Sequence, residues 1–233
     1  MAFAFSSRGR LTARDLDRFP GDTLFDRLAR SVCRAGCLPR KELYEAWEVG
    51  RRVRRLFRGG RIVDVCAAHG LLAHVLLLLD DSSPQALVVD KTIPPSGGKI
   101  HDALVDAWPR LAGRVSFVAG ALEEVELTAD DLVVSIHACG AMTDRVLERA
   151  ASARARVAVV PCCHDAATCD AGPLGGWLDD PLAIDVLRAV RLGGAGYRVW
   201  TMKIPEAITP KNRLLLGAPA GEPPAPTGAK VPP

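Results

Sequence analysis

The stretch from Arg61 to Leu79, RIVDVCAAHGLLAHVLLLL, constrains the fold of this chain more than any other feature. It predicts a buried strand, a tight turn of small residues and then an apolar helix. Asp64 stands at the end of the strand, and Gly70 stands where the helix begins. In folds built from parallel strands and covering helices, this turn is where a nucleotide-like cofactor is held.

The same alternation continues along the chain as five strand–helix units, followed by a final pair of strands. The predicted strands are Ile62–Val65, Ala86–Val89, Val115–Val118, Leu132–Ile136, Val157–Val160, Tyr197–Lys203 and Arg213–Leu216. The predicted helices begin at Gly70, around His101, at Thr143 and at Pro181, and a loop rich in Pro and Gly precedes the second of them. This order predicts a Rossmann-like α/β fold, with a mostly parallel seven-stranded sheet and helices on both faces.

The chain divides into three parts by composition. Residues 1–58 predict a small, basic, helical N-terminal segment, and residues 59–217 carry the strand–helix units. Residues 218–233 are dominated by Pro, Gly and Ala, which is typical of a disordered tail.

Charge is distributed unevenly between these parts. Residues 1–61 hold 15 Lys and Arg against 7 Asp and Glu, whereas the rest holds 15 against 20. A basic segment on an acidic body indicates a polyanionic partner, with RNA as the leading candidate. The alternative is a solvated helix face rich in Arg, part of which suits the negative end of a helix dipole. We expect neither a membrane partner nor the reading of a DNA sequence.

The cysteines and the apolar runs indicate the compartment. Seven cysteines are an odd number, and several end apolar strands, which favours reduced thiols over a disulfide framework. The longest apolar run, residues 70–79, is too short to cross a bilayer. The first ten residues lack the pattern of a signal peptide. We therefore expect a cytoplasmic protein.

The turn after the first strand carries a cofactor motif in altered form. Asp64, Cys66, Ala68 and Gly70 occupy the spacing of the Asp/Glu-x-Gly-x-Gly-x-Gly motif of methyltransferases that use S-adenosylmethionine (SAM). Small residues there let the backbone approach the methionine portion of the cofactor. A plain strand-to-helix turn is the alternative interpretation. The intact G-x-G-x-x-G that a dinucleotide requires is absent, which favours SAM over NAD.

Further candidate cofactor residues follow the next strands. Asp90 ends the second strand, 26 residues after Asp64, where an acid binds the ribose hydroxyls. Gly120, Ala121 and Leu122 follow the third strand, where backbone groups would hold the adenine ring. Ser135, at the end of the fourth strand, completes the predicted set.

Two clusters of His and Cys end the fourth and fifth strands. These ends read SIHACGAMTD (135–144) and VPCCHDAATC (160–169), and the candidate catalytic residues are His137, His164, Cys163 and Asp144. In one interpretation His137 and His164 flank the methyl-accepting atom, and one of the two imidazoles positions or deprotonates the acceptor. In a second, buried thiols and hydrogen-bonded histidines only shape the pocket.

A third interpretation is a zinc site drawn from His137, Cys139, Cys163, His164 and Cys169. The spacing fits no common zinc motif, and the adjacent Cys162 and Cys163 would point to opposite sides if the strand continues. We therefore expect no bound metal.

These two clusters resemble a known group of methyltransferase domains, which includes eukaryotic tRNA 2′-O-methyltransferases of the zinc-module type. In that group the fourth strand ends in His-x-Cys-Gly with Thr-Asp close behind, and the fifth ends in Cys-Cys-His. Here these positions are His137, Cys139, Gly140, Thr143, Asp144 and Cys162–His164. TPKNRLLLG (209–217) resembles the closing strand of the same domains.

The resemblance implies SAM as the cofactor and RNA, with tRNA as one such substrate, as the methyl acceptor. The chain departs from the group at Asp165, where a second His is usual, and it shows no N-terminal zinc module. The alternatives are a protein or small-molecule methyltransferase, a non-catalytic SAM- or RNA-binding module, and a nicotinamide oxidoreductase.

Overall fold

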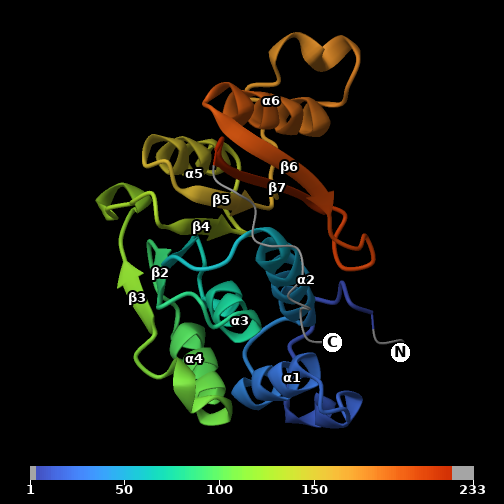
Figure 1. Ribbon diagram of the computed structural model, residues 1–233. Helices are drawn as coiled ribbons and strands as arrows, with labels where there is room; N and C mark the ends of the chain where they lie inside the picture. The colour runs from blue at the N-terminus through green and yellow to red at the C-terminus, as the bar shows by residue number, and fades with distance from the viewer. Residues whose placement is uncertain (1–3, 222–233) are drawn as a thin grey trace.

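A single seven-stranded sheet forms the centre of the molecule in the computed structural model, which describes residues 4–221 (Figure 1). Its strand order is β3-β2-β1-β4-β5-β7-β6. Strands β1 to β5 are parallel, and β7 is antiparallel to both β5 and β6. The strands are β1 Ile62–Val65, β2 Ala86–Asp90, β3 Val115–Ala119, β4 Leu132–Ser135, β5 Arg156–Val159, β6 Tyr197–Lys203 and β7 Arg213–Pro219. The predicted fold class is confirmed.

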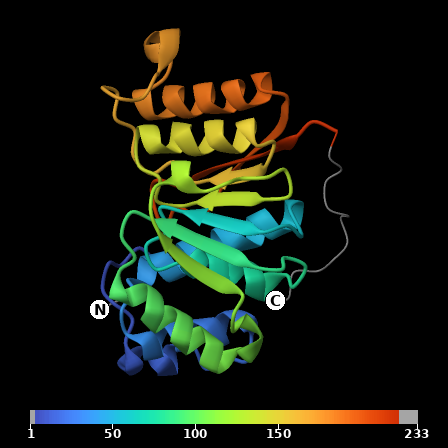
Figure 2. The same ribbon diagram turned by 90° about the vertical axis from the view of Figure 1, so that its left-hand side faces the viewer.

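Helices cover both faces of this sheet (Figure 2). One layer contains α1 Leu24–Ala35, α2 Arg40–Leu56, α3 Leu71–Leu79 and α4 Pro95–Ala107. The other contains α5 Ala141–Ser152 and α6 Asp180–Gly194. Four short 3-10 helices connect these elements: η1 Ala13–Arg18, η2 Pro109–Leu111, η3 Leu122–Glu124 and η4 Gly172–Gly176.

Side chains alternate between two hydrophobic clusters along each central strand. In β1, Ile62 packs with the layer of α1 to α4, whereas Val63 and Val65 pack with α5 and α6. All four residues of β1 are buried because helices cover both faces. Since Asp64 follows the same alternation as Ile62, its carboxylate points toward α3.

The N-terminal helices share their core with α3 and α4. Leu28 and Trp47 belong to the same buried cluster as Val75 and Leu76. Helices α2 and α3 lie close together at Gly50, where an added Cβ would stand 2.7 Å from Val75 Cγ1. The segment 1–58 therefore covers the sheet directly.

Two boundaries differ from the predicted ones. Helix α4 begins at Pro95, before the predicted start near His101, because proline is well suited to a first helical turn and Gly97 packs closely against Phe117. Strand β7 continues to Pro219, within the predicted tail, and residues 222–233 of that tail lie outside the described residues. Among residues 4–221, no helix combines the length and apolarity that a membrane crossing requires.

Candidate active site

The carboxyl ends of the five parallel strands meet at one edge of the sheet, which gathers the predicted residues. Strand pairing places Asp64 beside Val88, and Asp90 beside Ala119. Ser135 pairs with Val159 at the same edge. The turn after β1, the ends of β2 and β3 and the loops after β4 and β5 therefore border one region.

The turn after β1 keeps the backbone conformation of a glycine motif although two glycines are replaced. Cys66 has φ 54° and Ala68 has φ 45°, both in the left-handed region, and Gly70 has φ 68°. Each non-glycine residue in this region costs about 1–2 kcal/mol of conformational free energy. Backbone strain of this kind occurs mainly at functional sites. The backbone at all three motif positions thus has the left-handed conformation that glycine adopts without strain.

Gly70 is required for a second reason, which is packing. A Cβ added at Gly70 would lie 2.7 Å from Val88 Cγ2, so a side chain there would collide with β2. Helix α3 can start directly against the sheet only because this position is bare.

Asp90 holds the turn to the neighbouring strand ends. Its Oδ2 atom accepts a hydrogen bond from the Ala68 amide at 2.8 Å, and its carbonyl accepts one from the Gly120 amide at 2.9 Å. The side chain is half-buried at the edge of the sheet. A carboxylate in this place fits the predicted ribose contact. Beyond it, Leu122 is buried and the Ala121 amide donates to Glu124 Oε2 at 3.3 Å.

Asp64 lies beneath the first turn of α3. Its carboxylate is 2% exposed and accepts a hydrogen bond from the Ala73 amide at 3.1 Å. Burial raises the pKa of Asp64 to about 7, against the lowering effect of that hydrogen bond. The residue therefore anchors α3 as well as bordering the predicted methionine end.

The Ser135 hydroxyl is already engaged by the protein. Its Oγ donates to the Val65 carbonyl at 2.7 Å and accepts from the Ala138 amide at 3.1 Å. These bonds join the ends of β1 and β4. Ser135 is 1% exposed, so the structure gives its side chain a role in shaping the edge.

His137 faces the layer of α2 and α3. It lines a small hollow together with Asp64, His69 and Glu42. Burial lowers the pKa of His137, while Glu42 and Glu45 act in the opposite direction. A neutral imidazole beside the cofactor turn can accept a proton.

Glu42 and His69 were not predicted, although His69 lies next to Gly70 inside the motif. Glu42, in the first turn of α2, is hydrogen-bonded to His69 Nε2. This contact brings the N-terminal segment to the cofactor edge. The position of His69 in the turn was a signal in the sequence, but nothing there linked it to Glu42.

His164 faces the opposite layer. Its Nε2 atom lies 2.8 Å from Asp185 Oδ1, in α6. Asp185 Oδ2 accepts a hydrogen bond from Arg213 Nε at 2.6 Å, and Arg188 Nη1 lies 3.2 Å from Asp185 Oδ1. The structure does not bring His137 and His164 together, because one faces α2 and the other is tied to α6. The expectation that both flank one methyl-accepting atom finds no support in this geometry.

Asp144 forms a bidentate ion pair with Arg188, at 2.9 Å and 2.7 Å. Arg188 is 2% exposed and also donates to the Gly140 carbonyl at 2.9 Å. Asp144 thus fixes the loop after β4 through an arginine. This is a positioning arrangement, unlike the catalytic role predicted for Asp144.

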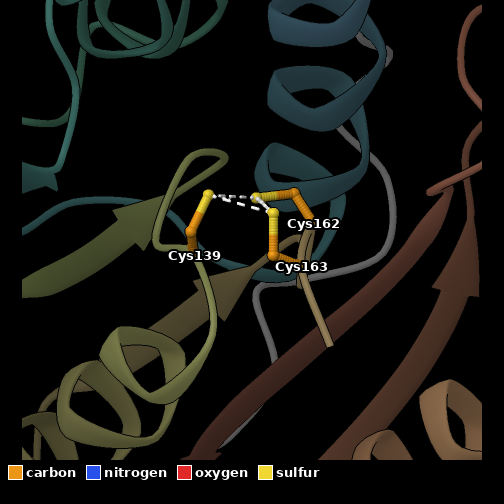
Figure 3. A group of neighbouring side chains, drawn as sticks. All are labelled: Cys139, Cys162 and Cys163. Atoms are coloured by element: carbon orange, nitrogen blue, oxygen red, sulfur yellow. Dashed lines mark hydrogen bonds between the residues drawn. The ribbon is translucent and has the colours of Figure 1, made fainter. Parts of the chain in front are cut away.

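Cys139, Cys162 and Cys163 converge at the ends of β4 and β5 (Figure 3). Cys162 and Cys163 were expected to point to opposite sides only if the strand continued through them, and this condition is not met, because β5 ends at Val159. A hydrogen bond with Cys139 and the nearby Lys211 ammonium lower the pKa of Cys163, whereas burial raises that of Cys139 and Cys162. All seven cysteines lie within the described residues, and none forms a disulfide there.

A cavity of about 510 Å³ opens between α6 and strands β6 and β7. Its walls are mostly apolar, and the lining includes Leu182, Met202 and Leu214, with Asp185 and Arg213 among the polar groups. Pro161, directly after β5, also lines it. Volumes of about 300–1,000 Å³ with a few polar groups are usual for small-ligand pockets.

Several arginines of the N-terminal basic region are used within the protein. Arg54 is fully buried and donates to the Leu76 carbonyl at 3.0 Å and to Ser83 at 2.8 Å. Arg61 forms a bidentate pair with Asp131, at 2.9 Å and 2.8 Å. The positive charge of this region is therefore partly structural, which reduces its value as an indication of RNA binding.

A family model described as "Methyltransferase domain" matches residues 51–169, about half of the chain. No curated protein matches the sequence.

Two solved structures illustrate the similarity of fold. An O-methyltransferase family protein from Burkholderia thailandensis superposes with a TM-score of 0.51 at 18% identity, over 93% of this chain and 66% of that one. The SAM-dependent methyltransferase SibL, in its apo form, gives a TM-score of 0.50 at 19% identity, over 91% and 66%. The chain therefore spans just under two thirds of the length of either protein.

Proposed function

Because the chain belongs to the methyltransferase-domain family, we propose that it is a SAM-dependent methyltransferase whose acceptor is a compact, partly apolar molecule. The observation that carries the first half is the turn after β1. It holds Cys66 and Ala68 in glycine-like conformations at the spacing of the SAM motif.

The residues present fit SAM. The Cys66–Gly70 turn exposes backbone for the methionine portion, and Asp90 stands where the ribose hydroxyls need an acceptor. When bound, the cofactor supplies a methyl group on a sulfonium, which a nucleophile can take by direct displacement. The protein's own contribution is then to align the acceptor and to exclude water.

His137 is the proposed group that accepts the acceptor's proton. It shares a hollow with Asp64 at the cofactor edge, and burial keeps its imidazole neutral near pH 7. His164, held by Asp185, orients the loop after β5. The two histidines thus have different proposed roles.

The cavity between α6 and the last two strands has the volume and the apolar walls of a small-ligand pocket, and it is the reason for proposing a compact acceptor. It opens on the α6 face of the sheet, opposite to the face of His137, so His137 can accept a proton only from an acceptor atom that reaches past the cavity to the cofactor edge. The O-methyltransferase fold of the Burkholderia thailandensis protein is compatible with such a substrate.

RNA, including tRNA, is the second candidate acceptor. It is favoured by the excess of Lys and Arg in residues 1–61 and by the resemblance of the His-Cys strand ends to tRNA methyltransferases. The internal pairing of Arg54 and Arg61 weakens the first of these arguments.

Transfer of tritium from methyl-labelled SAM tests the proposal. The purified chain is incubated with separate pools of small metabolites, RNA and protein from cells that lack its gene. Label is expected in the metabolite pool, and the Asp90→Asn variant should lose it while the exposed Asp106→Asn variant in α4 retains it. Label found only in the RNA pool would show that the methyl acceptor is RNA and not a compact molecule. No label in any pool, from a protein that binds SAM, would contradict an enzymatic role.

A further inference from the structure

Three cysteine sulfurs meet at the edge of the sheet (Figure 3). The Sγ atom of Cys139 lies 3.0 Å from that of Cys162 and 3.3 Å from that of Cys163. Cys162 and Cys163 place their sulfurs 3.8 Å apart. The thiols come from two different loops, so their convergence is a property of the fold.

The two loops are fixed with respect to each other. The Gly140 amide donates to the Cys163 carbonyl at 3.2 Å, directly linking the loop after β4 to the loop after β5. Arg188 donates to the Gly140 carbonyl and is itself held by Asp144. Thr143 donates to the Ala138 carbonyl, on the other side of Cys139. Ligands supported in this way can bind an ion without reorganising the backbone.

The spacing of the sulfurs suits a shared metal ion. Tetrahedral thiolate ligands about 2.3 Å from a zinc ion lie roughly 3.8 Å from one another, which the cluster reaches with small side-chain movements. A disulfide, with sulfurs about 2.05 Å apart, would join only two of them and leave the third unexplained.

We propose that Cys139, Cys162 and Cys163 form a three-thiolate site for a thiophilic metal ion such as Zn²⁺. The group contains no imidazole or carboxylate among the described residues, so the protein supplies three ligands. Cys139 is exposed, and the fourth position therefore faces solvent. Zinc sites with three protein ligands and an open position bind water or a substrate atom there.

The site adjoins the proposed cofactor turn without using its residues. Cys139 follows β4, which pairs with β1, and the proposed cofactor turn follows β1. An exogenous ligand on the metal would consequently stand near the acceptor side of the edge. The metal site itself does not depend on methyl transfer.

Metal binding is measured on the full chain, reduced with a non-thiol reductant and freed of metal by a chelator. Binding of Zn²⁺ is expected to saturate at one equivalent per chain. The bound ion should protect three of the seven thiols from a thiol-modifying reagent. Titration with Co²⁺ should produce thiolate-to-metal charge-transfer absorption.

The Cys163→Ser variant should lower the affinity for Zn²⁺ by at least about 100-fold. Cys37→Ser, at a half-buried cysteine outside the cluster, should leave it unchanged. Thiol protection in the unsubstituted protein provides a readout that does not depend on how the variants fold.

Failure to bind one equivalent of Zn²⁺, or unchanged affinity in Cys163→Ser, would overturn the proposal. The proposal would also be overturned if the metal-free protein contained a Cys139–Cys162 disulfide and bound no Zn²⁺ after this disulfide had been reduced. Since SAM takes no part, either failure is distinct from failure of the proposed methyltransferase function.

Discussion

The turn after β1 and the His-Cys loops after β4 and β5 lie on one sheet edge but are built in different ways. The turn is a local structure, in which backbone conformations at Cys66, Ala68 and Gly70 create the site. The loops create theirs through side chains from distant elements, such as Asp185 and Arg213 around His164. The turn can therefore tolerate altered side chains. The role of each loop residue depends instead on which side chain of another element it contacts.

The largest expected effect is a difference in kcat between the variants of His137 and His164. His137→Ala should lower kcat for the labelled acceptor by roughly 10²- to 10⁴-fold, as expected when a general base is removed. His164→Asn should change kcat only a few-fold. It should lower the free energy of unfolding by about 1–3 kcal/mol, because the half-buried Asp185 carboxylate loses a partner.

Initial rates at saturating SAM and urea unfolding measure these two quantities. Equal losses of kcat in both variants, with SAM affinity retained, would remove the distinction drawn between the histidines.

A second effect concerns pH and the buried carboxyl of the turn. The pKa of Asp64 is about 7 in the folded protein against an ordinary value near 3.8, so between these values the native state holds a proton that the unfolded state has lost. The stability contribution of Asp64 therefore falls as pH rises from 4 to 7, by up to about 4 kcal/mol. In Asp64→Asn this decline should disappear.

The measurement is urea unfolding of both proteins between pH 4 and pH 8. The difference in unfolding free energy between Asp64→Asn and the parent should move in favour of the variant as pH rises. A difference independent of pH would show that Asp64 is ionised throughout.

Gly70 tests whether the turn depends on its backbone. Gly70→Ala combines a left-handed φ with a Cβ 2.7 Å from Val88, and should destabilise the protein by about 3 kcal/mol. Gly98→Ala, at an exposed helical position with open space, should instead stabilise it by roughly 1 kcal/mol. Destabilisation of equal size in both variants would contradict this account of Gly70.

The smallest expected effect comes from restoring a glycine at position 68 of the cofactor motif. Ala68→Gly should raise the unfolding free energy by about 1 kcal/mol, because glycine adopts φ 45° without strain. Ala67→Gly, at the adjacent buried position, should lower it by roughly 1–2 kcal/mol through lost packing and greater chain freedom. Thermal unfolding of the two variants distinguishes these opposite signs.

The sequence was sufficient for the fold because strand and helix periods are local signals. The positions of the strands and of the turn follow from runs such as IVDV and from the spacing of Asp64 and Asp90, whereas the order of the strands within the sheet comes from the structure. The start of α4 was missed, since two glycines there suggested a loop, and close packing against Phe117 explains only Gly97.

The site was predicted less completely, because spacing does not indicate which way a side chain turns. Neighbouring strand ends suggested that His137 and His164 share an acceptor, but α2 and α6 receive them on opposite faces. Conversely, the adjacent Cys162 and Cys163 were expected to diverge only if the strand continued through them, and in the loop after β5 they converge instead. The partners Asp185 and Arg188 come from a helix that no motif linked to the loops.

Calorimetric titration of SAM into the chain and its Asp90→Asn variant tests the central claim most directly. The account predicts one binding site in the parent protein and an affinity roughly 10- to 100-fold weaker in Asp90→Asn, corresponding to a lost hydrogen bond to a charged group. Asp106→Asn should bind as the parent does. No detectable SAM binding to the parent, or equal affinity in Asp90→Asn, would contradict the assignment of this sheet edge to the cofactor.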